Sequence, residues 1–106
     1  MPKYLVQGRY TTQGVKGLLK EGGSKRRAAV EELAKSLGGK VEAFYYAFGD
    51  ADVFVIIDGP DNATAAASSL AVNASGLVCL KTTPLLTAEE MDQAVKKGVK
   101  YRPPGA

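Results

Sequence analysis

The chain has 106 residues, of which 45% are hydrophobic and 24% are charged, and its formal net charge is +3. This length and balance are typical of one soluble domain with a single core, and so small a positive charge does not by itself indicate binding to nucleic acid. Histidine is absent and Cys79 is the only cysteine. This composition excludes a histidine base, a Ser-His-Asp triad and a His/Cys metal cluster within one chain. We expect neither a metal nor a cofactor.

The first third of the chain predicts one strand followed by two helical segments. Residues 4–10 are rich in aromatic and β-branched types, which favours a strand, and Thr11-Thr12 can cap the helix that follows. The Gly22-Gly23 pair interrupts this helix, and Ser24 is the expected N-cap of the second helix. Gly38-Gly39 ends the second helix. Its apolar stripe has the i, i+3, i+4, i+7 spacing of an amphipathic helix and consists of Val30, Leu33, Ala34 and Leu37.

A β-hairpin is predicted between Lys40 and Asp58. Two runs rich in β-branched and aromatic residues are joined there by the short polar turn Gly49-Asp50-Ala51-Asp52. Runs of this kind on either side of a Gly/Asp turn are a strong hairpin signal.

The second half of the chain predicts a helix, a strand and a final helix. Pro60-Asp61 opens an alanine-rich helix over residues 62–73, whose small side chains should let it lie close on the sheet. Gly76 ends this helix, and residues 77–83 favour a fourth strand. The sequence Thr87-Ala-Glu-Glu90 matches a capping box, which starts a helix extending to about Lys97.

This order of elements predicts an α+β ferredoxin-like βαββαβ sandwich, with a four-stranded antiparallel sheet and an added C-terminal helix. We expect a single domain over residues 1–98 and an extended or disordered tail over residues 99–106.

In this architecture two helices cover one face of the sheet and the other face is bare. Val53, Val55 and Ile57 suit the covered face, so that Phe54 and Ile56 point to the bare face. Monomeric proteins usually avoid such an exposed apolar patch. We therefore expect a homo-oligomer.

Short motifs follow one another along the chain at Gly8–Gly14, Arg26-Arg27, Gly38-Gly39, Gly49–Asp52, Pro60-Asp61, Asn73–Gly76 and Thr82–Thr87. Their order is that of the GYD domain family, small bacterial and archaeal ferredoxin-like proteins of unsettled function, and the chain resembles this family from about Tyr4 to Val95. The resemblance implies the same fold. The signature turn keeps its glycine and its last aspartate but has Ala51 in place of an aromatic residue. The family in turn resembles dimeric α/β-barrel proteins, whose bare sheet faces enclose small-molecule pockets, some of them catalytic.

Asp50 and Asp52 are the first candidate site. Two close carboxylates can act as a general acid and base, because each raises the pKa of the other. Asp52 is the better catalytic candidate, since it heads a central strand and can face the bare side. The alternative is turn chemistry, in which the aspartates accept hydrogen bonds from nearby backbone N–H groups.

Lys25, Arg26 and Arg27 are candidates for anion binding. They lie near the expected start of a helix, where positive charge opposes the helix dipole. Free helix N–H groups together with three cations would favour an anion or a carboxylate. The alternative is a solvated positive face, relieved by nearby glutamates or by another subunit.

A ligand pocket on the bare sheet face is a further candidate. An apolar floor with a few converging polar groups is the usual form of such a site, and the alternative role of the charged residues is to form salt bridges between subunits. The ligand would be a small anionic or aromatic molecule. The candidate residues are Gln7, Arg9, Asp52, Phe54 and Lys81, with Tyr45 or Tyr46 from the hairpin.

The cytoplasm is the expected compartment. The N-terminal residues lack the apolar region of a signal peptide, and no apolar run reaches the length of a membrane span. A single cysteine cannot form an intramolecular disulfide, which suits a reducing environment.

These observations favour an oligomeric protein that binds or senses a small molecule. A cofactor-free monooxygenase or isomerase is the alternative, with Asp52 or a tyrosine moving protons and Arg9 holding substrate charge. RNA binding is a more remote alternative, suggested by the topology of an RNA recognition motif. The third strand offers only Phe54, preceded by an acid, where such a motif requires a basic-glycine-aromatic sequence.

Overall fold

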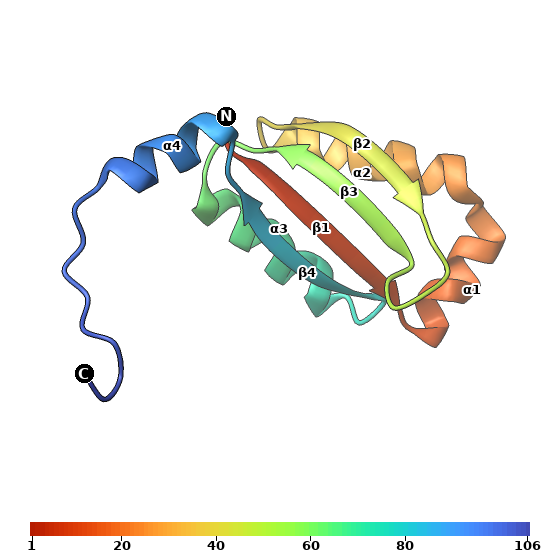
Figure 1. Ribbon diagram of the computed structural model, residues 1–106. Helices are drawn as coiled ribbons and strands as arrows, with labels where there is room; N and C mark the ends of the chain where they lie inside the picture. The colour runs from red at the N-terminus through yellow and green to blue at the C-terminus, as the bar shows by residue number, and fades with distance from the viewer.

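Eight elements follow one another in the predicted order, in a computed structural model that describes all 106 residues (Figure 1). They are β1 (Lys3–Tyr10), α1 (Thr12–Glu21), α2 (Gly23–Ser36), β2 (Lys40–Tyr46), β3 (Val53–Asp58), α3 (Asn62–Ala74), β4 (Val78–Leu85) and α4 (Ala88–Lys96).

The four strands form one antiparallel sheet in the order β2-β3-β1-β4. The ferredoxin-like fold is thereby confirmed, and so is the hairpin between β2 and β3. β4 runs two residues beyond the predicted strand and includes Pro84. A proline is compatible with this strand because β4 lies at the edge of the sheet. On the outer side of an edge strand there is no neighbouring strand to which a backbone N–H could donate, so its absence costs no hydrogen bond.

Local capping explains where the helices begin. The hydroxyl of Thr11 accepts a hydrogen bond from the N–H of Gly14, as expected for the cap of α1. Gly22, with φ of 86°, separates α1 from α2, and glycine adopts this conformation without a steric penalty. The prediction that Ser24 caps the second helix is wrong, because α2 already begins at Gly23. The predicted capping box of α4 is confirmed between Thr87 and Glu90.

The long helices lie on one face of the sheet, each against a different edge strand. α2 packs against β2, and α3 packs against β4 (Figure 1). Val53 and Val55 point to this face and are buried, as predicted. Only nine of the 106 residues are buried and no large side chain is fully buried, so the helical layer does not close over the centre of the sheet.

α4 and the tail lie outside the two layers. α4 leaves the end of β4 and runs away from the sheet (Figure 1), and every residue from Leu86 to Ala106 is exposed. None of the four helices has the length and apolarity needed to cross a membrane.

Candidate functional site

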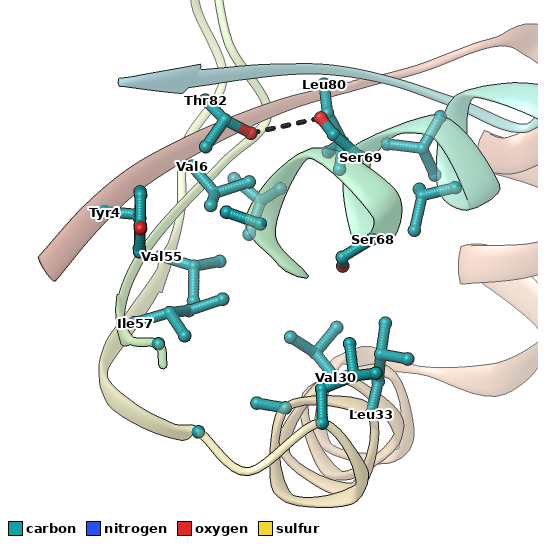
Figure 2. A pocket seen from close by; sticks show the side chains of 18 of the residues that line it. Tyr4, Val6, Val30, Leu33, Val55, Ile57, Ser68, Ser69, Leu80 and Thr82 are labelled. Atoms are coloured by element: carbon teal, nitrogen blue, oxygen red, sulfur yellow. Dashed lines mark hydrogen bonds between the residues drawn. The ribbon is translucent and has the colours of Figure 1, made fainter. Parts of the chain in front are cut away.

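An apolar cleft of about 150 Å³ lies between α2 and α3, above the two central strands. Its floor comes from the sheet and its two walls come from the helices, and Figure 2 shows side chains from both layers directed into it. Most of the lining is hydrophobic. The labelled apolar side chains are Val6, Val30, Leu33, Val55, Ile57 and Leu80.

The unequal size of the side chains on the two helices explains why the cleft is open. α2 presents its predicted apolar stripe, whereas α3 presents mostly small side chains, with Val72 as its one larger apolar residue. The α3 residues that line the cleft are Thr64, Ala65, Ser68, Ser69 and Val72. Leu33 and Leu37 consequently stay 40% and 38% exposed, although a stripe of this kind is normally covered by a facing helix. The alanine-rich sequence of α3 was expected to bring that helix close to the sheet. It does so against β4, and the same small side chains leave the space opposite α2 unfilled.

The α3 wall also carries hydroxyl groups. The hydroxyl of Ser69 lies 3.2 Å from that of Thr82 on β4, and the dashed line in Figure 2 marks this contact. At one end of the cleft, the hydroxyl of Tyr4 donates to Asn62 Oδ1 over 2.6 Å. Ser68 points across the cleft towards Val30 (Figure 2). Its hydroxyl is therefore positioned to meet a polar atom of a bound molecule.

Arg26 is the single charged residue that lines the cleft. Its side chain is 34% exposed, and its guanidinium lies 3.9 Å from Glu21, at the edge of ion-pair distance. Tyr10 lines the same part of the cleft. A partly exposed guanidinium with so weak a partner can bind an anionic group of a molecule held in the cleft.

Tyr46 packs beside this end of the cleft. Its ring meets Phe44 edge to face, with ring centres 5.1 Å apart, and its hydroxyl donates to the carbonyl oxygen of Gly23 over 2.8 Å. Burial raises the pKa of Tyr46 above its ordinary value, and the neighbouring Tyr10 adds to the increase while Arg26 opposes it. Tyr46 is thus a protonated, structural residue at neutral pH.

The three candidate anion-binding cations do not converge. Arg26 lines the cleft, whereas Lys25 is exposed and Arg27 lies 3.7 Å from Glu31 one turn further along α2. Consecutive residues of a helix point about 100° apart, as the 3.6-residue turn requires. Of this group, only Arg26 belongs to the cleft.

Asp52 forms hydrogen bonds with backbone groups of β1 through both its carboxylate and its own N–H. Its carboxylate accepts a hydrogen bond from the N–H of Tyr10 over 2.9 Å, and its own N–H donates to the carbonyl of Gly8 over 2.8 Å. The side chain therefore continues the β1–β3 pairing just before β3 begins. This hydrogen bond is structural, but it joins Asp52 to the neighbouring strand β1 and not to the backbone of its own turn, as the turn-chemistry alternative would have it.

Five of the predicted pocket residues share the bare face of the sheet. The strand register places Tyr45, Phe54, Gln7 and Lys81 in one row across the sheet, and Arg9 pairs with Cys79 in a neighbouring row. The suggestion that Tyr46 could join them is wrong: it pairs with Val53 and points to the helices. None of these five residues lines the cleft, which is on the opposite side of the sheet.

A comparison with models of protein families finds a match over most of the chain. The family model described as GYD domain matches residues 4–95. No match was found among curated proteins or among solved structures.

Proposed function

The chain belongs to the GYD domain family, and we propose that it is a binding or sensing protein for a small apolar molecule, which it holds in the cleft between α2 and α3. The observation that carries this proposal is the apolar cleft of about 150 Å³ at the place where the two helices of the fold would otherwise meet.

The size of the cleft indicates the size of the ligand. An apolar cavity of about 150 Å³ in another protein accommodates benzene, so a single aromatic ring or a short branched alkyl group suits this cleft. Large side chains that line the cleft, such as Leu33 and Leu37, are 40% and 38% exposed and so lack part of their packing. A ligand that restores this packing gains much of its binding free energy from the hydrophobic effect.

The polar groups that line the cleft indicate which substituent an aromatic ligand should carry. Arg26 favours an anionic or hydrogen-bond-accepting substituent at the entrance, and Ser68 offers a hydroxyl on the α3 wall. We therefore propose a small aromatic carboxylate, or a molecule of similar chemistry, as the ligand. A molecule that touches both helices favours the conformations in which both are held against the sheet, and such a shift in population can report its presence.

Binding is favoured over catalysis by the chemistry of the lining. Its polar side chains are hydroxyl groups and one guanidinium, without a carboxylate. General acid–base catalysis needs a group whose pKa lies near the working pH.

We also propose a cytoplasmic location, because the one cysteine, Cys79, is an exposed free thiol that a reducing compartment maintains.

Thermal unfolding in the presence of benzoate tests the proposal. Benzoate in excess of its Kd should stabilise the wild type by RT ln(1 + L/Kd), where L is the concentration of free benzoate, and so raise its Tm by about 4–8 °C for each kcal/mol of this stabilisation, whereas acetate, which lacks the ring, should not. Ser68→Leu fills the cleft and should abolish the benzoate effect. Ala67→Leu adds the same side chain at an exposed position of α3 and should retain it.

A second substitution tests the polar part of the site. Arg26→Gln should weaken the response to benzoate and leave the response to neutral benzyl alcohol unchanged. The proposal is wrong if neither aromatic compound raises the Tm of the wild type, or if Ser68→Leu responds to benzoate as strongly as Ala67→Leu.

A further inference from the structure

A carboxylate lies beside the single cation of the cleft. Glu21 is the last residue of α1, and its Oε2 is 3.9 Å from Nη1 of Arg26, near the start of α2. Arg26 lines the cleft, whereas Glu21 does not. A negative charge that a ligand brings to Arg26 therefore also comes close to Glu21.

The short connection between the two helices keeps Glu21 near Arg26. Gly22 is the single residue between α1 and α2. Its N–H donates to the carbonyl oxygen of Leu18 over 2.7 Å, and its own carbonyl oxygen accepts a hydrogen bond from the N–H of Arg26 over 3.4 Å. Because these bonds join backbone atoms, a ligand that contacts the side chain of Arg26 leaves them in place. Glu21 thus stays beside the guanidinium when the cleft is filled.

The ion pair is too long to hold the guanidinium in one orientation. An N–H···O hydrogen bond spans about 2.7–3.2 Å, and the side chains of Arg26 and Glu21 are 34% and 40% exposed. Ion pairs of this kind contribute little to stability. The donors of Arg26 consequently remain free for a ligand, while the charge of Glu21 remains next to them.

The other charged residues of this region do not line the cleft. Lys20, Lys25 and Arg27 are exposed, and none of them belongs to the lining. Glu21 is the one carboxylate within ion-pair distance of Arg26. These two side chains together bring no net charge to the place where a polar substituent of the ligand would lie.

We propose that Glu21 sets the charge preference of the cleft, by opposing the binding of a ligand in proportion to the negative charge that the ligand carries. This role depends on the ligand site proposed above. The repulsion between like charges grows with the product of the charges, so it is absent for a neutral ligand and about twice as large for a dianion as for a monoanion.

This charge preference narrows the class of ligand. A second negative charge gains little from the cleft, because Glu21 offsets the attraction of Arg26 while the charged group loses part of its hydration. The cleft should therefore bind an aromatic molecule with one negative charge more tightly than an aryl phosphate, which has two.

Dissociation constants of three aromatic ligands test the role of Glu21. Benzyl alcohol is neutral, benzoate is a monoanion, and phenyl phosphate is a dianion at pH values well above the second phosphate pKa of about 6. Each constant is measured by titrating the cleft methyl signals of the full chain. Glu21→Gln should leave the constant of benzyl alcohol unchanged, lower that of benzoate about threefold and lower that of phenyl phosphate about tenfold, as expected for partly exposed charges. Added salt should reduce these differences.

Glu31→Gln is the matched control. It removes the same charge from an ion pair of similar length, 3.7 Å, with Arg27, which does not line the cleft. The ratios between the three dissociation constants should stay as in the wild type. Both glutamates are exposed, and urea denaturation checks that each variant is folded.

The role of Glu21 is overturned if Glu21→Gln alters the three constants by the same factor or not at all, or if Glu31→Gln has the same effect. It is also overturned if Glu21→Gln weakens the binding of benzoate alone, because Glu21 would then position Arg26 for the ligand. These results leave the cleft as a ligand site. Failure of both the wild type and Glu21→Gln to bind any of the three compounds contradicts the site itself, and the role of Glu21 with it.

Discussion

The hydroxyl oxygens of Ser69 on α3 and Thr82 on β4 lie 3.2 Å apart, and this contact ties α3 to the edge strand on its own side of the sheet. α2 packs on the other side, against β2, where the hydroxyl of Tyr46 donates to the carbonyl oxygen of Gly23. Ser68, the neighbour of Ser69, then points into the space between the helices (Figure 2). The cleft is thus a consequence of where each helix is attached and of how little α3 extends towards α2.

Filling the cleft with a side chain should stabilise the protein. Ser68→Leu places an apolar side chain where Val30 and Leu33 lack contacts, and burying a leucine is worth about 1.5–3 kcal/mol. We expect a gain of about 1 kcal/mol in the free energy of unfolding measured with urea, because rearrangement of the lining offsets part of this. Ala67→Leu, at an exposed position, should change stability by less than about 0.5 kcal/mol. A loss of stability in Ser68→Leu alone would mean that the site is already filled.

Gly14 and Gly17, both in α1, should respond in opposite ways to replacement by alanine. A Cβ at position 14 would lie 2.0 Å from the carbonyl oxygen of Leu77, whereas a Cβ at position 17 would have no neighbour within 4 Å. Gly17→Ala should raise the free energy of unfolding by up to about 1 kcal/mol, because alanine favours the helix interior. Gly14→Ala should lower it by about 1–3 kcal/mol, as overpacking does. Equal effects of the two substitutions in urea denaturation would contradict the close contact of α1 with Leu77.

The two aspartates of the hairpin turn should differ in their effect on stability. Asp52→Ala leaves the N–H of Tyr10 without its acceptor and should lower the free energy of unfolding by about 1–2 kcal/mol. Asp52→Asn keeps an acceptor oxygen and should lose less. Asp50 is exposed, so Asp50→Ala serves as the control, with an expected change below about 0.5 kcal/mol. Chemical denaturation that ranks Asp50→Ala at or above Asp52→Ala would disprove the role of Asp52.

Acid should weaken the protein partly through Asp58. The carboxylate of Asp58 accepts a hydrogen bond from Lys3 over 2.8 Å, and this bond holds the pKa of Asp58 below its usual value. The hydrogen bond to Thr64 likewise lowers the pKa of Asp61. The unfolded chain therefore binds protons at higher pH than the folded one. The stabilisation is complete above the ordinary aspartate pKa of about 3.9 and is lost as the pH falls through the lowered folded value.

Urea midpoints measured from neutral pH down to about pH 2.5, well below the ordinary aspartate pKa, test this dependence. Asp58→Asn should be less stable than the wild type at neutral pH and should lose less stability on acidification. Asp61 keeps its own contribution in this variant, so the acid dependence should shrink without disappearing. Parallel acid profiles of Asp58→Asn and the wild type would contradict the assignment to Asp58.

Local patterns in the sequence predicted most of the fold. The Gly/Asp turn between two β-rich runs predicted the hairpin, and Thr87 with Glu90 predicted the start of α4. Alternation along β3 separated Val53 from Phe54 correctly, because side chains on a strand point to opposite faces in turn.

Local patterns could not predict which residues of β2 face the helices or that a cleft exists between α2 and α3. Tyr45 and Tyr46 are adjacent and have the same side chain, so only the pairing register decides which of them faces the helices. That register also contains an irregularity between Val41 and Ala43, which no local pattern indicates. The cleft depends on a comparison across the fold, between the large side chains of α2 and the small ones of α3. The one available signal was the run of alanine and serine opposite a leucine-rich stripe.

A nuclear magnetic resonance titration with benzoate tests the central claim most directly, because it shows where the ligand binds as well as whether it binds. The methyl signals of Val30, Leu33 and Val55 should shift together and saturate, while those of Leu5 and Ile56 on the bare face should stay in place. Shifts confined to Leu5 and Ile56, or no saturable shift of the cleft methyl groups, would contradict a ligand site between α2 and α3.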